Sequence, residues 1–400
     1  GFVKQLTSKP VVGVGWFTSP DNMVSQINRG ILDFVGSARA SIADPFLPNK
    51  ILEGNEDDIR ECIGCNICAS CYNQGIPVRC TQNPTMGEEW RRGWHPERIK
   101  KKTSDESILI IGGGPAGLEA AMSLGKRGYE VTLAEKNKKL GGRINREIQL
   151  PGMSSYSRVK DYRTNQINQL ENVNVFLDNE MTTQDIIDME FEHVVIASGS
   201  SWELTTIDEK AIPISLSENT HLLTPDNILE GAEVSGPVVI YDFDYYYMGG
   251  LIAELLSDQG HSVTIVTPFE NVSPWSFMSN ELNDIKLRLN EKNVAIHTES
   301  RMLSNDSSSM KIVNRFNGAT SSLEAATIII VGTRKPNDAI YDELIKADKP
   351  NIKTIMKIGD VDAPGALYHA VYSGRLFAEY FGGKEPIDHM KLEYPVIESF

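Results

Sequence analysis

The chain has 400 residues, of which 40% are hydrophobic and 32 are glycine, a composition that indicates two or three globular α/β domains with ample core. The formal net charge of −15, from 54 acidic and 39 basic side chains, argues against nucleic acid and anionic membranes as partners and leaves a basic protein partner open. The apolar runs are too short to span a bilayer and no signal-peptide pattern is present, so we expect no membrane insertion and a cytoplasmic location in a reducing compartment.

The first fifty residues contain two βα units. Lys9–Trp16 predicts a buried strand, Ser19 predicts the start of a helix, and Ile31–Val35 predicts a second strand that leads into the loop Gly36–Arg39. Two such units cannot close a sheet, but the loops after the last two strands of a (β/α)8 barrel form its usual phosphate site. We therefore interpret residues 1–52 as the C-terminal remnant of a TIM barrel whose strands would expose unpaired edges. A small unrelated α/β flap is the alternative.

All five cysteines lie within twenty residues, at Cys62, Cys65, Cys68, Cys71 and Cys80. Disulfide scaffolds are usually short and spread their cysteines through the fold, which disfavours disulfides here. Thiols at this spacing can surround one side of a compact cluster, and a further thiol beyond a Gly-Ile-Pro turn can close it, as in iron–sulfur proteins. Structural zinc is the alternative, although zinc ribbons usually have two separated Cys-x2-Cys pairs. We expect an iron–sulfur segment over residues 53–100, with one cysteine to spare.

After a charged linker, the sequence predicts a dinucleotide-binding fold. The strand Ile108–Ile111 enters a Gly-x-Gly-x-x-Gly turn, a helix follows, and the next strand ends in Glu135. The three glycines, Gly112, Gly114 and Gly117, would permit a tight turn, close approach to a pyrophosphate and close helix–strand packing, while Glu135 would accept hydrogen bonds from a ribose. Strand, turn, helix and acid all have the expected spacing, so we expect an ADP-containing cofactor. A purely structural turn is the alternative.

Two later strands return to this first nucleotide domain, which we place at residues 101–220 and 333–400. One strand lies in His193–Ser200, and the other precedes Gly359 and Asp360. In flavoproteins with two dinucleotide domains, an acid in this second position faces the ribityl chain of the flavin. Each short motif alone is also compatible with an ordinary turn.

A second nucleotide-type domain is expected over residues 221–332, but its fingerprint has changed. Val238–Tyr241 predicts a strand, and a turn, a helix and a second strand follow it. The three glycine positions are occupied by Asp242, Asp244 and Tyr247, so carboxylates and a ring would stand where a pyrophosphate binds. We interpret this domain as a nicotinamide-domain scaffold without its nicotinamide site.

These motifs together resemble the C-terminal part of the iron–sulfur flavoproteins of the old yellow enzyme superfamily. The resemblance is greatest to trimethylamine and dimethylamine dehydrogenases and related N-methyl amino acid demethylases, and 2,4-dienoyl-CoA reductase is more distantly similar. It runs along almost the whole chain and is densest in VVGVGWFTSPDNM, GSARASIADPFLPNK, DDIRECIGCNICAS, CTQNPTMGEEWRRGWHPE, GGGPAGLEAA and VIASGSSW. The implied fold class is α/β: a TIM-barrel remnant, an iron–sulfur segment and two Rossmann-like domains arranged as in glutathione reductase.

The resemblance also implies roles for individual residues. Tyr72 falls at an aromatic position of the substrate bowl, where its ring would attract a methylated ammonium, although a packing tyrosine is the alternative. Cys71 is the spare thiol, and an exchange of its role with Cys80 stays open. The implied ligands of a [4Fe-4S] cluster are Cys62, Cys65, Cys68 and Cys80. The implied FMN contacts are Gly15, Gly36, Ala38 and Arg39, with Arg39 opposite the phosphate. The implied FAD or ADP contacts are Gly112, Gly114, Gly117, Glu135, Gly142, Arg143, Gly359 and Asp360.

The implied activity is oxidative N-demethylation of a secondary or tertiary amine or an N-methyl amino acid. FMN would take a hydride equivalent from the N-methyl carbon, and electrons would leave through the cluster to an electron-transferring flavoprotein. The catalytic side chains of the family lie on barrel strands absent from this sequence, so we assign no acid, base or nucleophile. The sequence leaves open whether FMN is covalently attached and whether the protein is a homodimer.

Two other function classes stay open. An NAD(P)H-dependent enoate or 2,4-dienoyl-CoA reductase would need nicotinamide to bind despite Asp242 and Asp244. A non-enzymatic electron-relay or assembly module would be favoured if the coding sequence were complete at Gly1.

Overall fold

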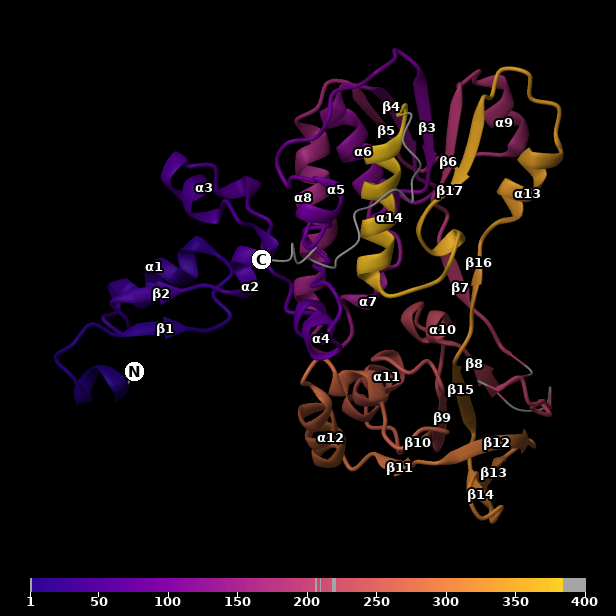
Figure 1. Cartoon of the computed structure of the whole chain (residues 1–400). Helices are drawn as coiled ribbons and strands as arrows, with labels where there is room; N and C mark the ends of the chain where they lie inside the picture. The colour runs from indigo at the N-terminus through magenta and orange to yellow at the C-terminus, as the bar shows by residue number, and fades with distance from the viewer. Residues whose placement is uncertain (1, 206, 209, 218–220, 384–400) are drawn as a thin grey trace, which may run out of the picture. The chain divides into compact units, whose positions relative to one another are not determined.

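The computed structural model describes residues 2–205, 207, 208, 210–217 and 221–383 (Figure 1). The last part of the expected nucleotide domain, residues 384–400, lies outside the described residues. The chain forms two compact units. Unit 1 comprises Gly1–Ile144, Ser155–Gly199 and Asp338–Phe400, and unit 2 comprises Asn145–Ser154 and Ser200–Asn337.

Unit 1 begins with a two-stranded parallel sheet and short helices. Ser19 caps the first turn of α1 by accepting a hydrogen bond from the Asn22 amide at 3.3 Å, as the sequence predicts. The expectation of a buried first strand is wrong, because Val12 and Val14 are 60% and 71% exposed. Within the described residues, β2 is the only neighbour of β1 in its sheet. The elements are η1 (Phe2–Leu6), β1 (Val12–Val14), α1 (Pro20–Asn28), β2 (Phe34–Gly36), α2 (Arg39–Ala43) and α3 (Leu47–Glu53).

The cysteine segment of unit 1 has little regular structure. It contains η2 (Glu56–Asp58), α4 (Ile67–Asn73) and α5 (Glu89–Arg92). Asn66 precedes α4 in the left-handed conformation, with φ of +52°, which asparagine tolerates better than most residues.

The rest of unit 1 is a doubly wound fold around a five-stranded sheet. All its strands are parallel, in the order β17-β6-β3-β4-β5. The strands are β3 (Ser107–Ile111), β4 (Glu130–Ala134), β5 (Val173–Phe176), β6 (His193–Ile196) and β17 (Thr354–Lys357). The helices are α6 (Pro115–Arg127), α7 (Ile144–Glu147, at the boundary with unit 2), η3 (Ser154–Tyr156), α8 (Ser157–Asn168), α9 (Thr183–Asp188), α13 (Ala339–Lys346), η5 (Gly359–Val361) and α14 (Leu367–Tyr380).

Alternate side chains of β3 point into the two cores of this sheet, as strand geometry requires. Ile108 and Ile110 pack with Leu118 of α6, whereas Leu109 packs with Ile186 of α9. Parallel strands buried on both faces read as continuous apolar runs, which is why the sequence identified this strand.

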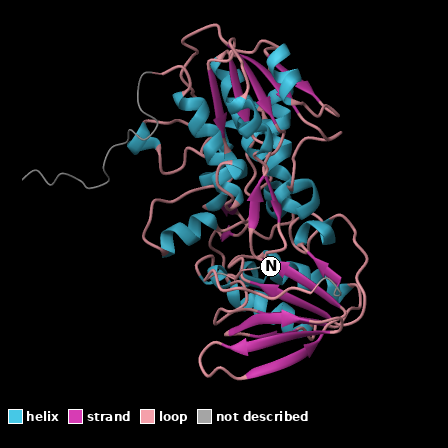
Figure 2. Cartoon of the chain, turned by 90° about the vertical axis from the view of Figure 1, so that its right-hand side faces the viewer, coloured by secondary structure: helices cyan, strands magenta, loops and turns pink. Residues whose placement is uncertain are grey.

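Unit 2 contains a second five-stranded parallel sheet, in the order β11-β10-β9-β15-β8, and a three-stranded antiparallel sheet (Figure 2). The expected strand–turn–helix–strand unit is present as β9, α11 and β10. The strands are β7 (Ser200–Trp202), β8 (His221–Leu223), β9 (Val238–Asp242), β10 (Val263–Val266), β11 (Ala295–His297), β12 (Ser300–Asn305), β13 (Ser309–Asn314), β14 (Thr320–Glu324), β15 (Thr327–Val331) and β16 (Arg334–Pro336), which pairs with β7. The helices are α10 (Pro225–Leu229), α11 (Met248–Asp258), η4 (Pro274–Phe277) and α12 (Leu282–Glu291). The two parallel sheets confirm the α/β fold class.

Candidate functional site

The turn between β3 and α6 is tight on one side and open on the other. A Cβ on Gly112, whose φ is +111°, would lie 2.4 Å from the Ala197 carbonyl oxygen, and a Cβ on Gly117 would lie 1.9 Å from the Gly112 carbonyl oxygen. A Cβ on Gly114, the N-cap of α6, would meet no atom within 4 Å. The turn therefore leaves open space at the N-terminus of a 13-residue helix, where backbone N–H groups favour an anion.

Glu135 lies beside this turn, at the end of β4. Glu135 is 4% exposed. Its Oε2 accepts a hydrogen bond from the Gly113 amide at 2.7 Å, and its Oε1 accepts from the Asn137 amide at 2.8 Å and from Asn137 Nδ2 at 2.5 Å. A carboxylate has about four lone-pair sites, two on each oxygen, so Oε2 retains capacity for a ribose hydroxyl.

Two more expected cofactor segments converge on the start of α6. A Cβ on Gly142 would lie 3.1 Å from the Gly114 Cα atom, and Arg143 follows in the same turn. A Cβ on Gly359, whose φ is +71°, would lie 2.7 Å from a Cβ atom of α6. The Asp360 carboxylate accepts a backbone hydrogen bond at 3.2 Å. Residues widely separated in sequence therefore surround one helix N-terminus.

The expected flavin-phosphate residues lie after the two N-terminal strands. Val14 of β1 is in register with Gly36 of β2, so Gly15 and the loop before Ala38 follow at the same edge of the sheet. Ala38 is the N-cap of α2 and makes no side-chain capping bond. Arg39, the first residue of α2, extends to the cysteine segment, where its Nη1 donates a hydrogen bond to Asn66 Oδ1 at 2.6 Å.

Four of the five thiols surround one cavity, which we call the four-thiol cavity. It is lined by Cys62, Cys65, Cys68 and Cys80, together with Arg39, Ile42, Ile63, Asn66 and Gln82. The five cysteines are all free thiols. Burial raises the pKa of the Cys65 thiol to about 11 and that of the Cys80 thiol to about 12. In the part of the chain that the structure describes, no group of three or more His, Cys, Asp or Glu side chains is arranged to hold a metal ion.

The donor chemistry of the four-thiol cavity fits an iron–sulfur cluster. Backbone amides approach the sulfur atoms: the Gly64 amide donates to Cys62 Sγ at 3.4 Å, and the Asn83 amide donates to Cys80 Sγ at 3.5 Å. N–H donors to sulfur stabilise the thiolates of such clusters and tune their reduction potential. A cluster core also separates its thiolates more widely than a single zinc ion does, since zinc holds each sulfur at about 2.3 Å.

A buried ion pair of the nucleotide fold holds one wall of this cavity. Arg163 of α8 pairs with Glu119 of α6 at 2.8 Å, and both side chains are almost completely buried. The same guanidinium donates to the Gln82 side-chain oxygen at 3.0 Å and to its carbonyl oxygen at 3.2 Å. Sequence reasoning missed Arg163 and Gln82, because they are 81 residues apart and neither belongs to a recognised motif.

A second arginine of α8 reaches the cysteine loop. Arg158 Nη1 donates to the Cys62 carbonyl oxygen at 2.8 Å, and Nη2 pairs with Glu61 Oε2 at 2.9 Å. Thr18 also donates to Glu61, at 3.1 Å, so the N-terminal segment, the cysteine loop and α8 meet at one carboxylate. Sequence reasoning missed Arg158 as well.

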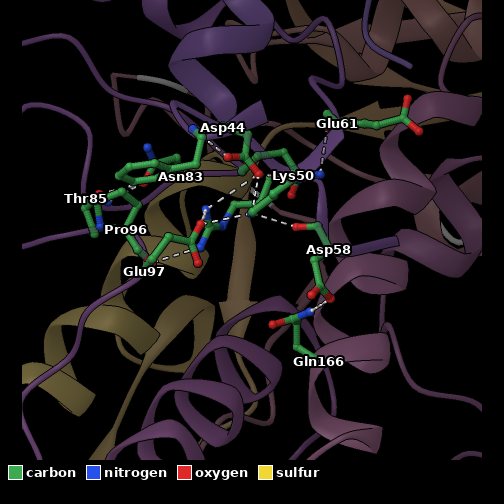
Figure 3. Close-up of polar contacts among 12 residues, drawn as sticks. Asp44, Lys50, Asp58, Glu61, Asn83, Thr85, Pro96, Glu97 and Gln166 are labelled. Carbon is green, nitrogen blue, oxygen red and sulfur yellow. Dashed lines mark hydrogen bonds and ion pairs between the residues drawn. The ribbon is translucent and has the colours of Figure 1, made fainter. Parts of the chain in front are cut away.

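A buried charge network fixes the segments on either side of the cysteines (Figure 3). Asp44, fully buried, accepts from Lys50 Nζ at 2.6 Å and from the Arg60 amide at 2.9 Å. Glu97 accepts from Lys50 at 3.0 Å and from Arg60 at 2.7 Å. The neighbouring cations lower the pKa of Glu97 to about 2 against the opposing effect of its burial. These buried contacts therefore connect α2 and α3 to the segments on either side of the cysteines.

Neither Cys71 nor Tyr72 lines the four-thiol cavity. Cys71 is 3% exposed and does not line the cavity, and burial raises the pKa of its thiol. Tyr72 is 77% exposed near the end of α4. Tyr72 therefore lies outside the lining of the four-thiol cavity, and its place in a substrate bowl stays a prediction.

In unit 2, the corresponding turn after β9 is filled by its own side chains. Asp242 is 2% exposed, and a Cβ on Gly249 would lie 2.2 Å from its Oδ2 atom. Burial, together with the nearby Asp244 charge, raises the pKa of Asp242 to about 8. Tyr247, the N-cap of α11, donates its hydroxyl to Glu147 Oε2 at 3.2 Å. These contacts oppose phosphate binding at this turn.

Comparison with known proteins gives two family matches. Residues 106–374 match the pyridine nucleotide-disulphide oxidoreductase family, and residues 1–58 match the NADH:flavin oxidoreductase/NADH oxidase family. The chain is 36% identical over 422 aligned positions to dimethylamine dehydrogenase of Hyphomicrobium sp. (strain x), covering 97% of this chain and 57% of that protein.

Two solved structures are also similar. Histamine dehydrogenase from Rhizobium sp. 4-9 matches with a TM-score of 0.94 and 40% identity, over 99% of this chain and 59% of that one. The 6-hydroxypseudooxynicotine amine oxidase from Pseudomonas geniculata N1 matches with a TM-score of 0.93 and 43% identity, over 95% of this chain and 57% of that one. The chain therefore spans a little over half the length of these relatives. No helix of the described residues has the length and hydropathy needed to cross a membrane.

Proposed function

The chain belongs to the pyridine nucleotide-disulphide oxidoreductase family, and from its similarity to dimethylamine dehydrogenase we propose that the protein is an amine dehydrogenase. One observation carries the proposal: a segment that matches flavin oxidoreductases, the four-thiol cavity and an open dinucleotide turn all lie in the same compact unit. A flavin, a cluster and an ADP-containing group held in that unit would form a path for electrons. The division into domains at residues 1–52, 53–100, 101–220 with 333–400, and 221–332 is part of the proposal.

The residues of unit 1 would hold three groups. When bound, flavin supplies two-electron oxidation of the amine and the cluster supplies one-electron transfer onward. The loops at Gly15 and at Gly36–Arg39 would bind the FMN phosphate, and the turn at Gly112–Gly117 with Glu135 would bind FAD or ADP. The cluster would be held by Cys62, Cys65, Cys68 and Cys80.

The substrate we propose is a secondary or tertiary amine or an N-methyl amino acid, which would be oxidatively demethylated. The similarity to dimethylamine dehydrogenase supports this class. Tyr72 has an exposed ring that would suit a methylated ammonium. The proposed electron acceptor is an electron-transferring flavoprotein, and the proposed location is the cytoplasm. The similarity to histamine dehydrogenase and to an amine oxidase makes deamination of other amines the nearest variant of the proposal.

An NAD(P)H-dependent reductase is the second candidate, because unit 2 retains the parallel sheet of a nicotinamide domain. The buried Asp242 and the contacts of Tyr247 argue against a dinucleotide at its turn.

The proposal is tested by reducing the complete protein without oxygen. Flavin absorbance is followed after addition of NADPH, NADH or a panel of N-methylated and primary amines, and formaldehyde and ammonia are measured in the products. Bleaching by N-methylated amines with release of formaldehyde is expected. Bleaching by a nicotinamide and by no amine would replace the proposal with the reductase.

A further inference from the structure

Arg39 belongs to two sites at once. It opens α2 directly after the loop expected to hold the flavin phosphate, and it also lines the four-thiol cavity. Its Nη1 donates to Asn66 Oδ1 at 2.6 Å, across 27 residues of sequence. A guanidinium has five N–H donors in a rigid fork, so this bond leaves most of them free for an anion.

The bond to Asn66 acts on the cysteine loop itself. Asn66 lies between Cys65 and Cys68 and has a φ of +52°, so the loop turns sharply there before α4 begins. Fixing this side chain fixes the direction in which the two flanking thiols enter the cavity.

Two arginines lie near the cavity, and they differ in whether a carboxylate of the described residues pairs with them. Arg158, which contacts the Cys62 carbonyl oxygen, forms an ion pair with Glu61 at 2.9 Å. Among the residues that the structure describes, no carboxylate pairs with Arg39, and the proposed flavin phosphate is the anion that would face it. The cavity therefore has one net positive side chain in its wall, beside apolar Ile42.

We propose that Arg39 links the flavin-phosphate loop to the iron–sulfur cluster and raises the reduction potential of the cluster. Reduction adds one electron, and so one negative charge, to the cluster, and a nearby cation stabilises the reduced form more than the oxidised form. The bond to Asn66 holds that cation at the cavity wall. Arg39 is thus a positioning residue that favours electron transfer from flavin to cluster. This inference depends on the proposed function only in requiring a bound cluster.

The test is a one-electron redox titration of the cluster in the purified, cluster-containing protein, followed by electron paramagnetic resonance with dithionite as reductant. Arg39→Gln removes the charge and keeps an N–H donor, and Arg39→Lys keeps the charge. The matched control combines Arg158→Gln with Glu61→Gln, which removes both charges of a neutral ion pair beside the same loop. We expect Arg39→Gln to disfavour reduction about tenfold, which corresponds to a fall of about 59 mV in a one-electron potential. Arg39→Lys and the double variant Arg158→Gln with Glu61→Gln should each change the reduction equilibrium less than about threefold.

Each outcome decides the proposal. An unchanged potential in Arg39→Gln with an intact cluster spectrum overturns it, and so does an equal fall in Arg39→Lys or in the double variant. Loss of the cluster in Arg39→Gln but not in Arg39→Lys supports the requirement for charge, whereas loss in both overturns it. If the unaltered protein binds no iron and sulfide, the cluster assignment of the proposed function has failed instead.

Discussion

Replacing Asp242 with asparagine should stabilise unit 2, in a pH-dependent way. Asp242 is 2% exposed, and its folded pKa of about 8 lies far above its ordinary value of 3.8. A carboxyl group whose pKa is higher in the folded state than in the unfolded state contributes its full stability only below the unfolded pKa. This contribution is lost as the pH rises toward the folded pKa. At about 1.4 kcal/mol for each pKa unit, ionisation in the unfolded chain costs the fold about 4 kcal/mol at pH 7 and about 6 kcal/mol above pH 8. Asparagine has nearly the same shape and no ionisation.

The assay is denaturant unfolding of both proteins at pH 4 to pH 9, monitored by tryptophan fluorescence. The variant should match the unaltered protein near pH 4 and gain stability steadily up to about pH 8. The control is Asp258→Asn, since Asp258 is 54% exposed and its surface pair with Lys292 should contribute less than about 1 kcal/mol. A gain that does not vary with pH, or no gain at pH 8, would refute this explanation of the Asp242 environment.

Further substitutions separate folding from cofactor binding in unit 1. Gly117→Ala should release the bound adenine nucleotide and lower the melting temperature, because its Cβ would lie 1.9 Å from a backbone oxygen, whereas Gly114→Ala should weaken nucleotide binding with little change in melting temperature. Equal melting temperatures for the two variants would contradict this. Cys80→Ser should reduce bound iron and sulfide and Cys71→Ser should not, because Cys80 lines the four-thiol cavity and Cys71 does not. If Cys71→Ser lost iron and Cys80→Ser did not, Cys71 would be the cluster ligand and Cys80 the spare thiol.

Local patterns allowed the sequence to predict the nucleotide folds. The strand at Ile108–Ile111, the glycine turn and Glu135 lie within thirty residues, so their spacing reflects one βα unit directly. The same reasoning located β9 and α11, whereas the loss of the nicotinamide site, inferred from the missing glycines, stays a prediction that the close approach of Asp242 to Gly249 supports.

Contacts over long sequence distances could not be predicted in this way. The exposure of Val12 depends on which strands pair with β1, and a local sequence pattern does not determine strand pairing. Arg158 is 96 residues from the Cys62 carbonyl group that it contacts, and a lone arginine on a polar helix has no distinguishing signal. Arg39 was expected at a phosphate, but its bond to Asn66 depends on how α2 packs against the cysteine loop.

Rapid freezing of the complete protein after anaerobic mixing with an N-methylated amine, followed by electron paramagnetic resonance, tests whether electrons from the amine reach the cluster. We predict that the amine produces the signal of a reduced iron–sulfur cluster within the time of flavin bleaching, and that NADPH and NADH produce no such signal. A cluster signal produced by a nicotinamide and by none of the amines would contradict it.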